Sequence, residues 1–265
     1  MHKTFLTIIA ALLPAIACAQ DWAKPRLENS PRHLEYVKVK QGDRQLTCFV
    51  AYPEVKDKAT TVIVIHEIFG LTDWVRGVAD QLAEAGYIAV APDLLSGMGP
   101  EGGDTDAFGA GDAVRKAITS LPPDQVTADL NAAAAYGVKL PASNGKLAVC
   151  GFCWGGTQTF RYATNNKDLK AAFVFYGSGP DDADAIARIA SPVYGFYGGN
   201  DARVNATIPK SKELMKDAGK TYEPVIYEGA GHGFMRAAEA PEATAENKKG
   251  REEAWARWKE ILEKL

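Results

Sequence analysis

A cysteine between two glycines, directly after an apolar run, constrains the fold of this chain more than any other feature. Residues 147–150 are typical of a buried strand, and residues 157–163 are typical of a helix. The pattern Gly-x-Cys-x-Gly centred on Cys153 predicts a turn so tight that the cysteine backbone is strained, with glycine required two residues to either side. The start of the helix then favours a thiolate. The alternative is a buried cysteine at a strand end, beside glycines that serve packing.

Apolar, strand-like runs alternate with amphipathic segments along the rest of the chain. A hairpin comes first, with strands at residues 34–39 and 46–52. Further strands are expected at 61–65, 87–91, 171–176, 192–197 and 224–227, and helices at 73–85, 110–120, 123–137, 181–189, 208–218 and 245–265. This alternation predicts an α/β-hydrolase type of α/β fold, with a mostly parallel central sheet and helices on both faces. Residues 33–265 suit one such domain.

The N-terminus has the three parts of a secretory signal peptide, residues 1–19. Lys3 gives a positive start, residues 5–16 form an apolar stretch too short to span a bilayer, and Ala17-Cys18-Ala19 fits the small-residue cleavage rule. Cleavage before Gln20 predicts a periplasmic or secreted protein. A lipoprotein cleaved before Cys18 is less favoured, because the residues ahead of it fit that signal poorly. A buried N-terminal helix is the remaining alternative.

Two further segments lack any periodicity. Residues 20–32 are polar and contain two prolines, so we expect an extended arm. Residues 96–109 are rich in glycine and acidic side chains. We expect a mobile loop over the site there, with a disordered surface insertion as the alternative.

Three cysteines remain after removal of the signal peptide: Cys48, Cys150 and Cys153. An odd number leaves at least one thiol unpaired within the chain. Cys150 and Cys153 have the spacing of a redox pair, but along a strand their Cα atoms would lie roughly 10 Å apart, beyond disulfide reach. Thiol redox chemistry is therefore a less favoured alternative.

The net charge of −3 provides no basic field for nucleic acid or an anionic membrane. Only four histidines are present, and no His/Cys pair has metal-ligand spacing. We therefore expect a small-molecule substrate, no nucleic acid, no membrane span, no metal and a monomeric protein.

Reactive side chains follow four of the predicted strands, at the edge of the sheet where ligands bind in folds of this class. They are Glu67, Cys153, Asp201 and His232. Along the chain, the nucleophile Cys153 comes first, then the acid Asp201, then the histidine His232. This is the chain order of an α/β-hydrolase triad. His232 would take the thiol proton and return it to the leaving group, while Asp201 orients the imidazole. Taken alone, Asp201 is better explained as a turn residue and His232 as a loop histidine. The order of the three residues along the chain favours the triad.

Glu67 adds a carboxylate near the predicted nucleophile. Such a group either disfavours the thiolate by like charge or accepts the thiol proton, so it holds the nucleophile neutral until substrate arrives. A surface glutamate is the alternative. The backbone N–H groups of Ile68, in the same loop, and of Trp154, directly after the cysteine, are the predicted oxyanion-hole donors.

Four segments together resemble the dienelactone hydrolase (carboxymethylenebutenolidase) family of the α/β-hydrolase superfamily. They are Glu67-Ile68-Phe69-Gly70, Gly151-Phe152-Cys153-Trp154-Gly155-Gly156, Gly198-Gly199-Asn200-Asp201 and Gly231-His232-Gly233-Phe234. The resemblance extends over nearly all of the chain from about Val37 onward. It implies ring-opening hydrolysis of an unsaturated lactone through a cysteinyl acyl-enzyme, without a cofactor. It also implies that Glu67 accepts the thiol proton once substrate binding frees it.

Substrate binding is where the sequence departs from this family. Arg236 matches a family arginine that holds the substrate carboxylate, a role suited to a guanidinium. A surface ion pair with acidic residues around Glu239 is the alternative. A second carboxylate-binding arginine of the dienelactone-cleaving members is replaced around Gly97. The resemblance therefore implies the reaction type and leaves the substrate open.

Aromatic side chains are expected to shape the acyl pocket. Phe69 lies beside the oxyanion loop and Tyr176 ends a predicted strand, while Trp74 could also face the cleft; core packing is the alternative for all three. The sequence thus predicts a cysteine-dependent hydrolase of a lactone or activated carboxylic ester. A general carboxylesterase or thioesterase with the same residues, and a non-catalytic binding protein, are the alternatives.

Overall fold

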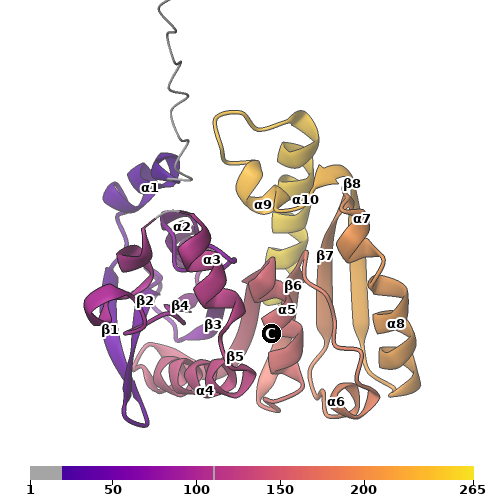
Figure 1. Cartoon of the computed structure of the whole chain (residues 1–265), viewed down its shortest axis with the longest axis horizontal. Coiled ribbons are helices and arrows are strands. Elements are labelled where there is room, and N and C mark those ends of the chain that lie inside the picture. The colour runs from indigo at the N-terminus through magenta and orange to yellow at the C-terminus, as the bar shows by residue number, and fades with distance from the viewer. Residues whose placement is uncertain (1–19, 110) are drawn as a thin grey trace, which may run out of the picture.

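One eight-stranded sheet organises the chain, in the order β1-β2-β4-β3-β5-β6-β7-β8 (Figure 1). The computed structural model describes residues 20–109 and 111–265, so the predicted signal peptide lies outside the described residues and stays a prediction. The predicted hairpin pairs antiparallel, and its second strand also pairs antiparallel with β4, whereas every other strand pair is parallel. The predicted fold class is confirmed. The strands are β1 Leu34–Gln41, β2 Arg44–Ala51, β3 Ala59–Ile65, β4 Ile88–Pro92, β5 Ser143–Phe152, β6 Leu169–Phe175, β7 Val193–Asn200 and β8 Tyr222–Gly231.

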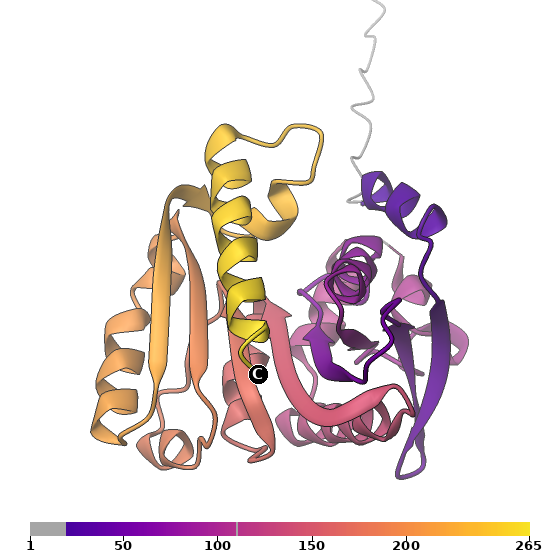
Figure 2. The same ribbon diagram turned by 180° about the vertical axis from the view of Figure 1, so that it is seen from behind.

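Helices cover both faces of this sheet, as Figures 1 and 2 show from opposite sides. Helices α2 (Asp73–Glu84) and α10 (Ala245–Leu262) pack on one face. The other face is covered by α3 Asp112–Thr119, α4 Pro123–Lys139, α5 Trp154–Ala163, α6 Ala183–Ala187 and α8 Ile208–Asp217. Within the described ranges, no helix is long and apolar enough to cross a membrane.

The strand β3 illustrates why the central strands are largely apolar on both faces. Ile63 and Ile65 belong to the core beneath α4 and α5, whereas Val62 and Val64 belong to the core beneath α2 and α10. Every residue of β3 is buried. A parallel strand covered on both faces has no polar side, so the period-two pattern of a half-exposed strand is lost.

The core beneath α10 is built from aromatic rings. Trp258 of α10 is fully buried, with its ring centroid 4.8 Å from that of Phe175 and 5.8 Å from that of Phe173. Phe152, the last residue of β5, lies 4.7 Å from Phe175. This cluster therefore joins the C-terminal helix to the strand that leads into Cys153.

The extended arm predicted for residues 20–32 is wrong at its centre, where the chain forms η1 (Asp21–Ala23) and α1 (Lys24–Glu28). A proline in the first turn of a helix needs no N–H partner and has a suitable φ, so Pro25 starts α1 instead of breaking it. Arg26 and Arg32 each place Nε 2.7 Å from the buried carboxylate of Asp80 in α2. The arm is thus fastened to the domain by ion pairs that its own sequence does not reveal.

The segment 96–109 contains two short turns of helix, η2 (Pro100–Gly102) and η3 (Thr105–Phe108). Buried Asp93 accepts hydrogen bonds from the Thr105 backbone N–H at 2.9 Å and from its hydroxyl at 2.7 Å. The Thr105 side chain fills the space beside Gly70, where an added Cβ would meet it at 2.4 Å. The segment is therefore anchored against the loop that follows β3.

Candidate active site

Cys153 lies in the sharp turn between β5 and α5, with φ 56° and ψ −116°. The chain crosses itself closely here: a Cβ on Gly151 would lie 2.2 Å from the Gly155 carbonyl oxygen, and one on Gly155 would lie 2.3 Å from the His66 carbonyl oxygen. Only glycine fits such contacts, as the sequence pattern predicted. Helix α5 begins at Trp154, directly after the cysteine. The turn therefore presents the sulfur at the sheet edge.

The structure brings together the three residues predicted to form a triad. His232 follows β8, and its Nε2 lies 3.2 Å from Cys153 Sγ. Its Nδ1 lies 2.5 Å from Oδ2 of Asp201, the residue after β7. A carboxylate accepts hydrogen bonds, so Nδ1 carries the proton and Nε2 is free to accept the thiol proton. Asp201 is buried and also accepts the Val204 N–H at 3.3 Å, which fixes the carboxylate.

The resting sulfur is held in its neutral form. Burial raises the pKa of the Cys153 thiol, and the negative charge of Glu67 raises it further. The backbone N–H groups of Trp154 and Ile68, together with the charge of Arg203, lower this pKa but do not cancel the rise. Both predicted oxyanion donors are therefore near enough to act on the sulfur.

Glu67 is buried, so the surface-glutamate alternative is wrong. Its Oε2 accepts a hydrogen bond from Arg236 Nε at 2.7 Å. Burial raises the pKa of the Glu67 carboxyl, whereas the Arg236 guanidinium acts in the opposite direction. Glu239, named in the surface-pair alternative for Arg236, lies 2.6 Å from Arg251. In this state the Glu67 carboxylate is held by an arginine and influences the thiol through its charge.

Replacing Glu67 by glutamine is expected to speed the alkylation of Cys153 by iodoacetamide about threefold to tenfold near neutral pH. The carboxylate charge disfavours the thiolate, so its removal lowers the pKa of Cys153 and raises the thiolate fraction. The rate is measured by mass spectrometry of the intact protein. Glu213→Gln, which alters a surface carboxylate of α8 paired with Lys210, is the matched control. Slower or unchanged alkylation of the Glu67 variant would contradict the charge effect.

Cys153 opens onto a cavity of ≈ 320 Å³. Tyr176, predicted to shape the acyl pocket, lines this cavity, and its ring packs edge-on against His232 at 5.2 Å between centroids. Trp74 is buried in the core against Phe152 instead, which decides between the two interpretations of that side chain. The complete lining consists of Ile68, Cys153, Trp154, Thr157, Tyr176, Ser178, Arg203 and Val204.

Phe69 and the segment 96–109 are not among the described residues that line this cavity. Phe69 instead lines a separate cavity of ≈ 170 Å³ with Thr105. Its ring lies beneath two guanidinium groups, with Arg115 at 5.2 Å and Arg236 at 5.3 Å from the ring centroid. The cavity at Cys153 is thus lined without Phe69 and without the segment 96–109, and the predicted roles of both at the site stay predictions.

The other two cysteines are buried, and all three are free thiols. Burial raises the pKa of the Cys150 thiol well above its ordinary value and that of Cys48 to about 12. Neither is suited to exchange with solvent thiols, because exchange requires a thiolate. Among residues 20–109 and 111–265, no group of three or more His, Cys, Asp or Glu side chains is arranged to hold a metal ion.

His66 is a site residue whose role the sequence did not reveal. It is fully buried, and burial lowers its pKa, so the imidazole is neutral. Its Nδ1 lies 2.8 Å from the Glu67 carbonyl oxygen, and its Nε2 accepts the Leu94 N–H at 3.3 Å. Its ring stacks on Trp154 at 5.7 Å. His66 therefore braces both segments that carry the predicted oxyanion donors, a role signalled only by its position beside Glu67 at a strand end.

Arg203 is the second such residue. It stands two positions after Asp201, in α7 (Ala202–Asn205), and lines the cavity at Cys153. In the sequence, Arg203 was indicated only by its position two residues after Asp201, a predicted catalytic residue at a strand end.

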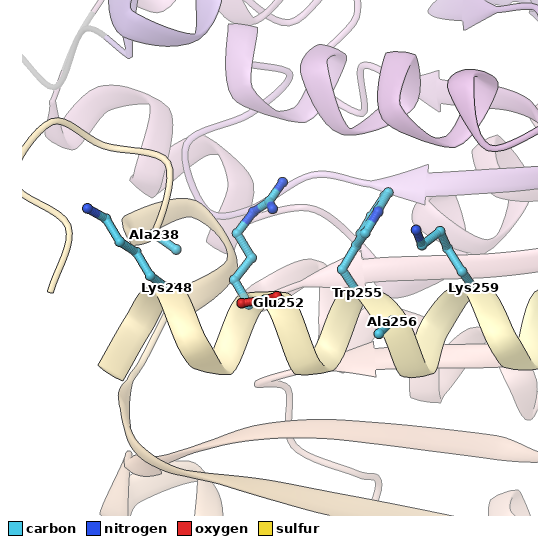
Figure 3. Close-up of a pocket in the computed structure, with 7 residues that line it drawn as sticks. Ala238, Lys248, Glu252, Trp255, Ala256 and Lys259 are labelled. Atoms are coloured by element: carbon cyan, nitrogen blue, oxygen red, sulfur yellow. The ribbon is translucent and has the colours of Figure 1, made fainter. Parts of the chain in front are cut away.

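A larger cavity of ≈ 520 Å³ lies elsewhere, along the outer side of α10. Figure 3 shows Lys248, Trp255 and Lys259 projecting into it from the same side of the helix. It shares no lining residue with the cavity at Cys153 and contains no residue of the predicted triad. Reactive side chains thus identify the smaller cavity as the candidate active site.

Comparison with known proteins gives a consistent family assignment. The sequence model of the dienelactone hydrolase family matches residues 46–265. A protein of Methylorubrum extorquens, provisionally named carboxymethylenebutenolidase, is 34% identical over 209 residues, which cover 75% of this chain and 71% of that protein. One of Salmonella typhimurium with the same provisional name is 32% identical over 236 residues, covering 84% and 83%. A crystal structure from Klebsiella pneumoniae, provisionally named dienelactone hydrolase, has a TM-score of 0.77 at 26% identity and covers 88% of this chain and 99% of its own. The chain therefore belongs to the dienelactone hydrolase family.

Proposed function

We propose that this hydrolase cleaves a lactone or an activated carboxylic ester through a thioester on Cys153. The observation that carries the proposal is the unbroken chain from Asp201 through His232 to the sulfur, at 2.5 and 3.2 Å. The names of the relatives from M. extorquens and S. typhimurium support a lactone, since carboxymethylenebutenolide is one. The cavity beside the sulfur supplies a place for the acyl group.

The first half of the proposed reaction acylates the enzyme. His232 Nε2 takes the thiol proton as Sγ attacks the carbonyl carbon, and the Asp201 carboxylate stabilises the resulting imidazolium. The backbone N–H groups of Ile68 and Trp154 donate to the oxyanion of the tetrahedral intermediate. When that intermediate collapses, the C–O bond breaks and the leaving oxygen receives the proton from His232. In a lactone this oxygen remains attached to the acyl group, so the ring opens.

The second half hydrolyses the thioester. A water molecule attacks the carbonyl carbon while His232 takes its proton, and the C–S bond then breaks. The acid leaves, and the sulfur regains a proton from His232. We propose that Glu67, whose charge raises the pKa of Cys153, keeps the sulfur protonated between turnovers. The family resemblance implies an alternative first step, in which the Glu67 carboxylate, once substrate binding frees it, takes the thiol proton in place of His232.

A general carboxylesterase or thioesterase remains the second candidate, on one specific observation. The missing family arginine is replaced around Gly97, whose N–H donates to Asp104 at 3.1 Å. Asp104 in turn pairs with Lys38 at 3.4 Å. Lys38, the cation near this loop, is therefore already paired with a carboxylate. This favours a substrate other than dienelactone itself.

A panel of unsaturated lactones and p-nitrophenyl esters tests the proposal. We expect turnover of at least one compound, with a mass increase equal to its acyl group on the protein quenched during turnover. Peptide mapping should locate that group on Cys153, and Cys153→Ala should show no such adduct. Turnover without an adduct in the wild-type protein and with undiminished rate in the variant would refute the thioester mechanism. The ranking of lactones against esters separates the two candidate functions.

A further inference from the structure

Arg203 is the only charged side chain among the residues that line the cavity at Cys153. Its side chain is exposed to solvent, and among the described residues no carboxylate lies within ion-pairing distance of its guanidinium. The Asp201 carboxylate, two residues earlier, is engaged by His232 and by the Val204 N–H instead. The cavity therefore contains one positive charge whose partner is not supplied by the described part of the chain.

Arg203 is also close to the reacting atom. Its positive charge is one of the influences that lower the pKa of the Cys153 thiol, so its field reaches the sulfur. Arg236, by contrast, is paired with Glu67, and neither of these two residues lines the cavity. The site thus has two separate cationic positions, of which only that of Arg203 shares a cavity with the nucleophile.

Ser178 adds a hydroxyl to the same cavity. Its backbone N–H donates to the Thr157 hydroxyl at 3.0 Å, which fixes the loop after β6 against the start of α5. The Ser178 hydroxyl itself forms no hydrogen bond with a described residue. A guanidinium and a free hydroxyl in one cavity match the acceptor oxygens of a carboxylate.

We propose that Arg203, with Ser178, binds a carboxylate on the acyl part of the substrate, so that the enzyme selects short anionic esters or lactones over neutral ones. This inference rests on the proposed function and specifies its substrate class. The cavity of ≈ 320 Å³ contains both the sulfur and Arg203, so the carboxylate must lie a few bonds from the carbonyl that Cys153 attacks. A neutral chain leaves the guanidinium unpaired, and a cationic chain is repelled.

A matched pair of esters tests this selection by turnover. Mono-p-nitrophenyl glutarate and p-nitrophenyl pentanoate share the leaving group and the number of acyl carbons, and differ in a terminal carboxylate or methyl group. The readout is the ratio of their kcat/KM values after subtraction of the rates without enzyme. We expect Arg203→Ala to lower the anionic-to-neutral ratio by roughly tenfold or more. Arg203→Lys should retain part of the ratio, and Arg203→Glu should lower it further.

The matched control for charge is Lys210→Ala, which removes a surface cation of α8 paired with Glu213 and absent from the cavity lining. Its ratio should equal that of the wild-type protein. Raising the salt concentration should lower the wild-type ratio and leave that of Arg203→Ala nearly constant, because salt screens a partly exposed charge pair. An equal ratio in the wild-type protein and in Arg203→Ala would overturn the inference.

Alkylation of the sulfur provides a second test that needs no ester hydrolysis. Iodoacetate and iodoacetamide form the same S–C bond with loss of iodide and differ in charge. Cys153 is the target, since Cys48 and Cys150 are buried. We expect the iodoacetate-to-iodoacetamide rate ratio, normalised to a small thiol, to fall roughly tenfold in Arg203→Ala.

The two tests separate this inference from the proposed function. If no ester or lactone is turned over but the alkylation ratio falls in Arg203→Ala, the anion site stands and the hydrolase proposal fails. If esters are turned over with Cys153 while both ratios are unaffected by Arg203→Ala, the hydrolase stands and the anion site is overturned.

Discussion

Cys153→Ala is expected to lower kcat/KM for the best ester or lactone by roughly 10⁴- to 10⁶-fold. The variant keeps the cavity and both N–H donors, but the imidazole then has no nucleophile to activate. The residual rate comes from substrate binding and oxyanion stabilisation, which assist attack by water. Initial rates measured over a wide range of enzyme concentration, with the protein-free rate subtracted, resolve an effect of this size.

His232→Gln is expected to cause a loss of similar order, and the double variant with Cys153→Ala should be little worse than either single one. Residues that act in one proton transfer are strongly non-additive. For Cys153→Ala, the matched control is Cys150→Ala. It makes the same substitution three residues earlier, at a buried thiol outside the cavity lining. Its activity should stay within a few-fold of the wild-type value. Additive losses in the double variant would mean that His232 and Cys153 act in separate steps.

Trp258→Ala is expected to lower the free energy of unfolding by about 3–5 kcal/mol. The ring is fully buried against Phe175 and Phe173, so its removal leaves a large void beneath the sheet. Close-packed interiors collapse only partly around such voids. Urea unfolding followed by far-UV circular dichroism measures the change in midpoint at constant slope.

The neighbouring Trp255→Ala is the control, because Trp255 is only partly buried and lines the outer cavity along α10. We expect it to cost about 1 kcal/mol. Equal losses in the two variants would contradict the assignment of Trp258 to the core. Since the aromatic cluster also contains Phe152, the residue before Cys153, kcat of the folded Trp258 variant should be compared with that of the Trp255 variant.

The strands and the predicted triad follow from local sequence. A run buried on both faces, such as β3, is apolar at most positions whatever its neighbours are. Cys153, Asp201 and His232 stand directly after three of the strands, and parallel strands bring their carboxyl ends to one edge. The glycines beside Cys153 then mark the tightest turn. No distant contact needs to be known for any of these inferences.

Features that depend on distant contacts were not predictable. Helix α1 is held by Asp80, which lies far along the chain in α2. Phe69 adjoins the oxyanion loop in sequence, yet its ring contacts Arg115 and Arg236 and lines another cavity. Arg203 lies in a short helix, and only the packing around Cys153 places it at the cavity. Sequence patterns thus place the predicted triad, whereas the side chains around the cavity depend on packing.

The charge that Glu67 exerts on Cys153 also bears on the durability of the sulfur. Peroxides and disulfides attack thiolates far faster than thiols, and the higher oxidation states of cysteine are irreversible. A nucleophile that rests as a thiol is therefore spared most of this damage and becomes vulnerable only while it is engaged with substrate. We therefore expect the carboxylate that restrains reactivity also to protect the sulfur of Cys153 from oxidation.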